Sequence, residues 1–151
     1  MPGPDDAQPR HLGNFTDLIL EEGRRDAPFT VHAELRQGLP YIVIQGSMNL
    51  VARERFIEEI GRFFSRLGHK GVVLDLSHCV RLTSSALGIL LAMNDAIADH
   101  GGCMVLLRPN THIDAVLSAL GLENYWVTVE SHAEAEAFFR RHDLLGDPPS
   151  G

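Results

Sequence analysis

Residues 71–102, GVVLDLSHCVRLTSSALGILLAMNDAIADHGG, decide the fold of this chain. An apolar run at 72–76 has the composition of a strand buried on both faces of a sheet. After a short polar connection, Ser84 and Ser85 open a segment of helical periodicity that ends at Gly101. A strand that delivers hydroxyl groups to a first helical turn places them beside unpaired N–H groups and the positive end of the helix dipole. Because phosphate is well held there, the stretch makes Ser84 a candidate phosphate-binding position.

Upstream of this stretch, the pattern predicts a hairpin and a helix. Residues 29–35 alternate apolar and polar side chains, and residues 41–44 are rich in β-forming residues. Gln37 and Gly38 supply the turn between them. Asn49 is a good helix N-cap, and apolar residues then recur at helical spacing as far as Gly68.

Downstream, strands and helices alternate. Residues 103–107 and 125–129 predict strands, residues 111–120 a helix, and the capping box at 131–134 opens a terminal helix. Short connections between alternating strands and helices indicate right-handed crossovers. We therefore expect an α/β fold: a mixed, mainly parallel sheet of about five strands, with an N-terminal β-hairpin and about four helices.

Composition divides the chain into one domain and two flanking segments. Residues 1–28 are rich in proline, glycine and charge and predict a partly disordered N-terminal extension. Residues 29–142 form the domain, and residues 143–151 are expected to be a disordered tail. Cys79 and Cys103 each adjoin an apolar run, which predicts two buried, reduced thiols rather than a disulfide framework.

The net charge of −7 excludes several classes of partner. Nucleic acids and anionic membranes are bound by basic surfaces, so neither is expected to be a partner. The chain also lacks an apolar run of the roughly 20 residues that span a bilayer, and its first residues lack an apolar signal core. We expect a cytoplasmic protein with no direct membrane insertion.

The predicted helix from Ser84 to His100 has an unusual outer face. Ala86, Leu90, Met93 and Ile97 form its core face, flanked by Leu87 and Ile89. The opposite face, where long polar side chains are usual, begins instead with small or apolar residues: Gly88, Leu91 and Ala92, followed by Asp95 and Asp99. This smooth surface beside Ser84 predicts a partner-binding site. Two alternatives remain: a merely exposed patch, or a patch covered by the N-terminal segment. Ser84 itself could also serve only as a helix cap.

Several sequence motifs together resemble the STAS domain family. The run TSSALG at 83–88 is similar to the family signature D-S-[ST]-[GA]-L-G, again between a strand and a helix. IVIQGSMN at 42–49 is similar to the family's G-E-[LI]-D stretch, and VLLRPN at 105–110 and VLSALGL at 116–122 extend the likeness. The resemblance covers approximately residues 29–140 and implies the α/β fold expected above.

The resemblance also implies a function, that of an anti-sigma factor antagonist. Bacterial single-domain members bind an anti-sigma factor that is also a serine kinase, and binding releases the sigma factor. Phosphorylation of the first signature serine, which matches Ser84, abolishes binding, and a serine phosphatase restores it. Ser85 is a secondary candidate acceptor. The predicted partner-binding residues are Thr83, Ser84, Ser85, Gly88, Leu91, Ala92, Asp95 and Asn49. A homodimer is also possible.

Two positions depart from the family's pattern. Thr83 and Asn49 stand where the family has aspartate, so two carboxylates near the acceptor serine are lost. Some STAS proteins act without phosphorylation, as subunits of lipid-transport ABC complexes or of stress-signalling assemblies, and this remains the main alternative.

A small enzyme is the least favoured alternative. The histidines are scattered, with no metal-ligand spacing, and nucleotide-binding and hydrolase motifs are absent. Asp75 follows a buried strand without an evident acid or base companion, and His78 and Cys79 lack a residue to orient them. We expect no catalytic residues, no metal and no cofactor.

Overall fold

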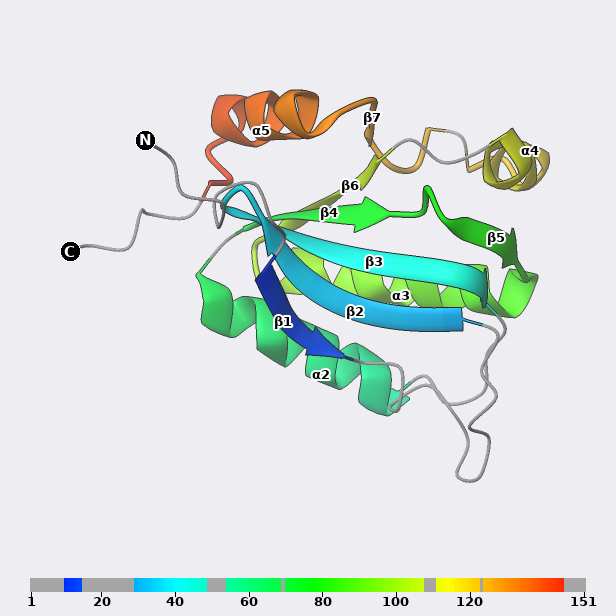
Figure 1. The fold of residues 1–151 in the computed structure, drawn as a ribbon, viewed down its shortest axis with the longest axis horizontal. Coiled ribbons are helices and arrows are strands. Elements are labelled where there is room, and N and C mark those ends of the chain that lie inside the picture. Colours follow the sequence, from blue (N-terminus) through cyan, green and yellow to red (C-terminus); the bar gives the residue numbers. More distant parts are fainter. Residues whose placement is uncertain are drawn as a thin grey trace.

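A computed structural model describes residues 10–14, 29–48, 54–68, 70–107, 111–122 and 124–145. Within these ranges the chain forms one seven-stranded sheet with helices on both faces (Figure 1). The strands are β1 (Arg10–Asn14), β2 (Phe29–Arg36), β3 (Leu39–Met48), β4 (Gly71–Asp75), β5 (Cys79–Leu82), β6 (Cys103–Leu107) and β7 (Thr128–Val129). The helices are α2 (Glu54–Leu67), α3 (Ser84–Asp99), α4 (Thr111–Ala119) and α5 (His132–Arg141).

The strand order is β1-β2-β3-β4-β6-β7. The pairs β1–β2 and β2–β3 are antiparallel, and the other pairs are parallel. Gln37 and Gly38 have φ values of 49° and 84° and form the tight turn between β2 and β3. The mixed, mainly parallel sheet and its antiparallel N-terminal hairpin are confirmed.

Strand β3 is long enough to pair with two partners in succession. Tyr41–Val43 pairs with β4, and Gly46–Met48 pairs with β5, which continues where β4 leaves the sheet. A backbone hydrogen bond from Gly46 N to His78 O, 2.9 Å long, joins the two regions. This arrangement carries the chain from the end of β4 to the beginning of α3.

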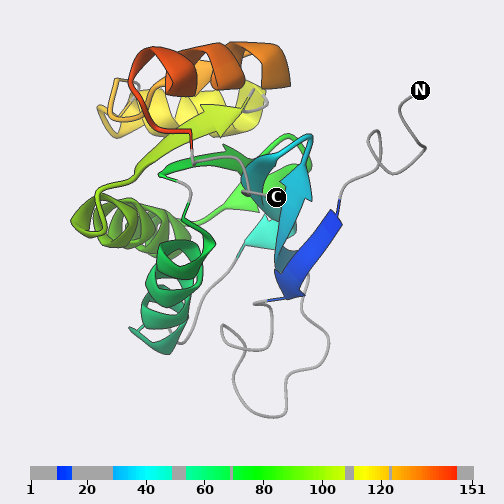
Figure 2. The same cartoon turned by 90° about the vertical axis from the view of Figure 1, so that its left-hand side faces the viewer.

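Helices α2 and α3 cover one face of the sheet, and α5 covers the other (Figures 1 and 2). Successive side chains of each strand point to opposite faces of the sheet. In β4, for example, Val72 and Leu74 belong to the core under α2 and α3, whereas Val73 belongs to the core under α5. We call these the larger core and the smaller core.

Helix α5 is held against the sheet by an aromatic side chain and by backbone hydrogen bonds. Phe139 is fully buried and its ring lies directly over Gly71, where a Cβ atom would come within 2.6 Å of the ring. The carbonyl of Leu144 accepts hydrogen bonds from Lys70 N and Gly71 N at 3.2 and 2.9 Å. The ring fits only because residue 71 is a glycine.

The structure differs from the sequence prediction at three elements. Strands β1 and β5 were not predicted, and the strand expected at 125–129 is only the two-residue β7. It is short because Trp126 turns into the larger core instead of extending the ladder. The predicted N-cap Asn49 lies outside the described residues, and the described part of that helix begins at Glu54.

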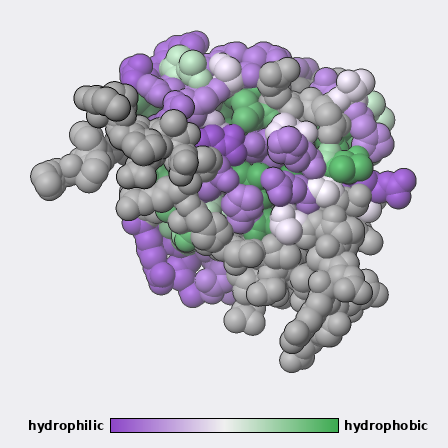
Figure 3. Space-filling view, viewed as in Figure 1, coloured by the Kyte–Doolittle hydropathy of each residue, from purple (hydrophilic) through white to green (hydrophobic). Residues whose placement is uncertain are grey.

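Both cysteines are free thiols: Cys79 is buried and Cys103 is half-buried, where burial raises the pKa of its thiol. None of the described helices combines the length and hydropathy needed to cross a membrane. On the side seen in Figure 3, the coloured residues are mostly hydrophilic, and hydrophobic ones form small separate patches.

Candidate functional site at the beginning of α3

The connection from β4 to α3 is shaped by hydrogen bonds within it. Asp75 ends β4, and its Oδ1 accepts a hydrogen bond from Ser77 N at 2.9 Å, which closes a turn of the type that aspartate favours. Cys79 N then donates to Leu76 O at 3.0 Å and leads into β5. Figure 1 shows that β5 and the beginning of α3 lie at the same end of the sheet.

Thr83 is the N-cap of α3. Its backbone is extended (φ −78°, ψ 162°), and its Oγ1 accepts a hydrogen bond from Ala86 N at 3.1 Å. Ser84 is therefore the first residue inside the helix rather than its cap, and Ser85 is the second. The capping role that the sequence left open for Ser84 belongs to Thr83.

The first turn of α3 contains no acidic residue. The N–H groups of the first residues of any helix have no partner inside that helix, and the helix dipole is positive there. Position 84 therefore lies in an environment that stabilises an added negative charge.

The two faces of α3 follow the predicted pattern. All six predicted core residues are buried: Ala86, Leu87, Ile89, Leu90, Met93 and Ile97. On the outer face, Gly88, Leu91 and Ala92 are partly exposed and Asp95 is exposed. A Cβ atom at Gly88 would meet no atom within 4 Å, so the surface next to the first turn is open. Leu91 also packs partly against the larger core.

The sequence did not single out Val80 of β5. Its side chain is 67% exposed, more than any other large hydrophobic residue in the described part of the chain. Val80 lies three residues before Thr83, at the end of the sheet where α3 begins. Its neighbour Arg81 is also exposed. An exposed valine in a short strand offers no periodic signal, so only the structure identifies it.

A cluster of polar side chains, separate from the beginning of α3, lies on the α5 face of the sheet. Arg36 donates from Nε to Glu34 at 2.9 Å and from a terminal nitrogen to Asp75 at 3.1 Å. Its guanidinium carbon lies 4.0 Å from the centre of the Tyr41 ring, and Tyr41 Oη lies 2.7 Å from His132 Nδ1. Asp75, which appeared in the sequence without a companion, is thus joined to a network drawn from β2, β3, β4 and α5.

Burial shifts the pKa values of two groups in this network. It is the main cause that raises the pKa of Tyr41 to about 12 and lowers that of His132 from its ordinary value. Tyr41 Oη and His132 Nδ1 share this hydrogen bond, and the lowered pKa favours the neutral form of the imidazole. Among the described residues no group of three histidine, cysteine, aspartate or glutamate side chains is arranged to hold a metal ion.

The sequence model of the STAS domain family matches residues 30–135. This chain belongs to the STAS domain family. No curated protein is significantly similar to it in sequence.

Solved structures with the same fold include anti-sigma factor antagonists. One, from Mycobacterium paratuberculosis, is 21% identical with a TM-score of 0.60, and the match covers 76% of this chain and 97% of that one. The anti-sigma factor antagonist SpoIIAA in its unphosphorylated form is 17% identical with a TM-score of 0.51, over 77% of this chain and 99% of that one. The Bacillus cell fate determinant SpoIIAA in its phosphorylated form is 19% identical with a TM-score of 0.51, over 74% and 98%.

These similarities confirm the predicted family and fold. At such identities they show the fold alone, so the roles of Ser84, Ser85 and the outer face of α3 remain predictions. Asn49, the last of the predicted partner-binding residues, lies outside the described residues.

Proposed function

We propose that this protein is an anti-sigma factor antagonist: a non-catalytic, cytoplasmic bacterial module that sequesters an anti-sigma factor with serine kinase activity while Ser84 is unphosphorylated. The observation that carries this proposal is the position of Ser84. It is the first residue of a helix that is already capped by Thr83, and the outer face beside it begins with Gly88 and Ala92.

The docking surface consists of the start of α3 and its outer face. A partner can approach closely at Gly88 because no side chain stands there and no atom would meet an added Cβ. Partly exposed Leu91 and Ala92 offer apolar area, and exposed Asp95 offers a charge at the margin. Interfaces commonly combine a desolvated apolar centre with a polar rim.

Phosphorylation of Ser84 would switch this surface off without unfolding the domain. A phosphate adds about −1.5 to −2 charges at pH 7, and the N-terminal end of a helix stabilises such a charge. The same charge would have to be desolvated when a partner covers Gly88 and Ala92, which is costly. Binding is lost while the fold persists. The kinase supplies ATP, magnesium and the catalytic base, and this chain supplies only the hydroxyl.

The phosphorylation step is tested by incubating the full chain with Mg-ATP and candidate anti-sigma serine kinases from the same genome. Intact-mass measurement should show one added phosphoryl group, absent in Ser84→Ala and retained in the matched control Ser85→Ala. A serine phosphatase of the same system should remove it. Phosphoryl transfer that persists in Ser84→Ala would overturn the assignment.

The binding step is tested by titration calorimetry with the same kinase. Ser84→Asp should weaken binding at least tenfold, or about 1.4 kcal/mol. Ser84→Asn, which has similar size but no charge, should change it by less than about threefold, or about 0.7 kcal/mol. Equal affinities for the aspartate and asparagine variants would exclude a charge-operated switch.

A second function is favoured by Thr83 and Asn49, which replace the acids of the family pattern. If a kinase recognises those acids, this chain would dock through the same surface without being phosphorylated, as a subunit of a lipid-transport ABC complex or a signalling assembly. In that case no kinase would modify Ser84, yet Gly88→Lys would still abolish partner binding.

A further inference from the structure

The side chain of Tyr125 is exposed, yet the chain on both sides of it is fixed. The residue is 43% exposed. Its backbone N–H donates to Leu122 O at 3.0 Å, and Leu122 packs against the larger core. Trp126, the next residue, is buried in that core, and the rings of Tyr125 and Trp126 meet edge to face with their centres 4.8 Å apart. The tyrosine ring is therefore held in place although it faces solvent.

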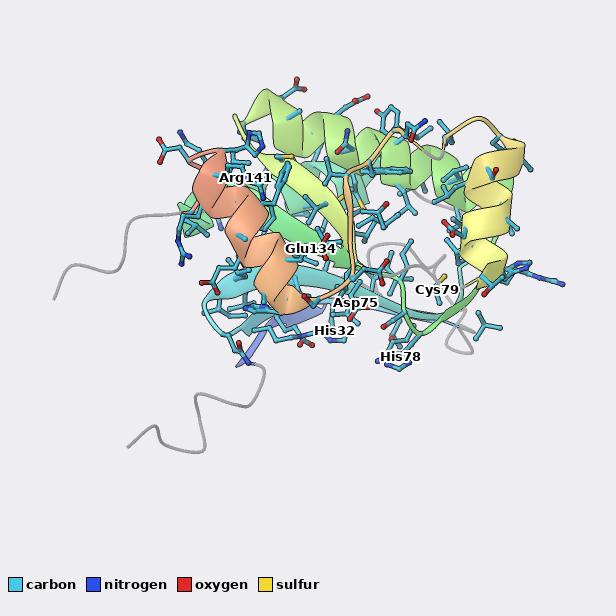
Figure 4. All side chains as sticks on the ribbon, turned by 90° about the horizontal axis from the view of Figure 1, so that it is seen from above. His32, Asp75, His78, Cys79, Glu134 and Arg141 are labelled. Carbon is cyan, nitrogen blue, oxygen red and sulfur yellow. The ribbon has the colours of Figure 1, made fainter. Side chains whose placement is uncertain are left out.

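A hydrogen bond joins Tyr125 to α3. Asn94 Nδ2 donates to Tyr125 Oη at 3.4 Å. Figure 4, seen from above, shows the connection between α4 and β7 passing next to α3. Residues 31 positions apart in the sequence thus share one surface, which the spacing of the sequence alone does not reveal.

A row of positions along α3 leads from the proposed phosphorylation site to this hydrogen bond. Steps of three or four residues make neighbours on a helix surface, and such steps connect Ser84, Gly88, Leu91 and Asn94. Gly88, Leu91 and Asn94 are all partly exposed. At 1.5 Å per residue the row is about 15 Å long. The docking surface proposed above is therefore continuous with the exposed ring of Tyr125.

Helix α2 limits this surface on the other edge of α3. A Cβ atom at Gly61 of α2 would lie 3.7 Å from Ala96 Cβ and 3.3 Å from His100 Nε2. Ala96 and His100 lie on the opposite edge of α3 from Asn94, because a helix turns about 100° per residue. A partner that lies along the row meets α2 on one side and Tyr125 on the other.

Tyrosine is well suited to such a position. Tyrosine is enriched in protein interfaces and among the few residues that carry most of the binding energy. Its ring offers a large contact area at a small cost in conformational entropy. Because the ring of Tyr125 is already fixed by Trp126 and Asn94, little further order is lost when a partner covers it.

We propose that the anti-sigma factor kinase buries the ring of Tyr125, which anchors the end of the docking surface far from Ser84. This inference rests on the proposed function because it assumes the same partner. It adds a division of the surface: a phosphate on Ser84 acts at one end, and the tyrosine ring contributes affinity at the other.

Titration calorimetry of the full chain with the anti-sigma kinase tests the anchor. Tyr125→Ala should weaken binding by at least about tenfold, as expected for truncation of an anchor residue. Tyr125→Phe keeps the ring and loses only one long hydrogen bond, so it should weaken binding by less than about threefold. The matched control is His142→Ala, which removes an exposed ring from the end of α5 on the opposite face of the sheet and should leave the affinity unchanged.

A double variant tests the division of the surface. Ser84→Asp combined with Tyr125→Ala should weaken binding by the product of the two single effects, because positions about 15 Å apart act independently. A double variant that binds no more weakly than Ser84→Asp would show that both substitutions act on one contact, against the proposal.

The remaining outcomes separate this inference from the proposed function. Wild-type affinity in Tyr125→Ala would overturn the anchor and leave the proposed function standing, whereas a wild type that binds no anti-sigma kinase would refute both. Conversion of a dimer to a monomer by Tyr125→Ala, with kinase affinity unchanged, would assign the ring to a contact between two copies and also overturn the anchor.

A measurement on the wild type decides if Tyr125→Ala does not fold. The chain has a single tryptophan, Trp126, so ¹⁵N-labelled protein gives one indole N–H signal. Because the ring of Tyr125 lies against Trp126, its burial by unlabelled kinase should shift this signal. An indole signal that does not move in the saturated complex would overturn the proposal.

Discussion

A single side chain, Thr83, determines where α3 begins and hence which serine lies first inside the helix. Threonine and aspartate both cap helices through a side-chain oxygen, so replacing the family's aspartate by threonine preserves the beginning of α3. What changes is the charge: the first turn is left without a carboxylate. The departure from the family signature is therefore electrostatic and leaves the local fold intact.

Substitutions of Thr83 should separate its capping of α3 from the charge at the first turn of that helix. Thr83→Ala removes the acceptor for Ala86 N and should lower the free energy of unfolding by about 1 kcal/mol. Thr83→Asp keeps a capping oxygen and adds a charge that the helix dipole favours, so its stability should lie within about 0.5 kcal/mol of wild type or above it. Urea denaturation followed by circular dichroism measures both. An alanine variant as stable as wild type would show that the cap contributes little.

His132 should make stability depend on pH in the mildly acidic range. Burial lowers its pKa from 6.5, so the folded protein holds it neutral while the unfolded chain binds a proton below about pH 6.5. Its contribution is fully present above that pH and is lost as the pH falls toward the lower folded-state pKa. The groups that face it are the Tyr41 hydroxyl, Glu136 and Arg36.

The matched variant is His132→Asn, whose side-chain amide can keep a hydrogen bond with the Tyr41 hydroxyl but does not titrate. Between pH 7.5 and pH 5 the wild type should lose more thermal stability than the variant. The other titrating groups contribute equally to both proteins, so the difference isolates His132. Parallel melting curves across this range would rule out a depressed pKa at this residue.

At the level of elements, the sequence predicted those that carry a periodic signal. The hairpin of β2 and β3, helix α3 and its end before Gly101 all follow from alternation, helical spacing or a glycine with positive φ. Half of the capping box predicted for α5 forms: Ser131 Oγ accepts from Glu134 N, but the Glu134 carboxylate accepts from Glu130 N rather than from the N–H of Ser131.

Elements without a local signal could not be predicted. Strand β5 is only four residues long, and its buried and exposed positions do not alternate, because both of its central residues are exposed. The polar cluster could not be predicted either, because its members are distant in sequence: Arg36 and Asp75 are 39 positions apart, and Tyr41 and His132 are 91 positions apart. The start of α3 could be found because its residues are contiguous, whereas the residues of the polar cluster meet only when the sheet forms.

Replacement by alanine should change the stability of the protein in opposite directions at two glycines. Gly71→Ala forces a methyl group into the Phe139 ring and should destabilise the protein by about 1–3 kcal/mol through overpacking. Gly88→Ala has open space and favours the helix, so it should stabilise by about 0.5–1 kcal/mol. Chemical denaturation measures both. If Gly88→Ala also weakens partner binding, close approach at this point is part of docking; unchanged binding would place the partner elsewhere.

For the molecule as a whole, the sheet separates α3 from the polar cluster on the α5 face. The beginning of α3 carries the proposed docking surface, and the polar cluster joins Arg36, Asp75, Tyr41 and His132. Strand β4 is shared by both regions, since it leads through β5 into α3 and ends at Asp75. Substitutions on the two sides are far enough apart in the structure that their stability effects should add.

Because the two cores differ in size, the sheet and α5 should differ in their local stability. Strand β4 is paired on both edges and buried on both faces, whereas α5 contributes only Ala135 and Phe139 as fully buried residues to the smaller core. Protection against amide hydrogen exchange should therefore be greatest in β4 and clearly weaker in α5, because the helix can detach while the sheet persists. Exchange measured by mass spectrometry checks this, and equal protection of the two segments would contradict it. Detachment of α5 would carry His132 away from Tyr41, so the polar cluster would lose its α5 member without the domain unfolding.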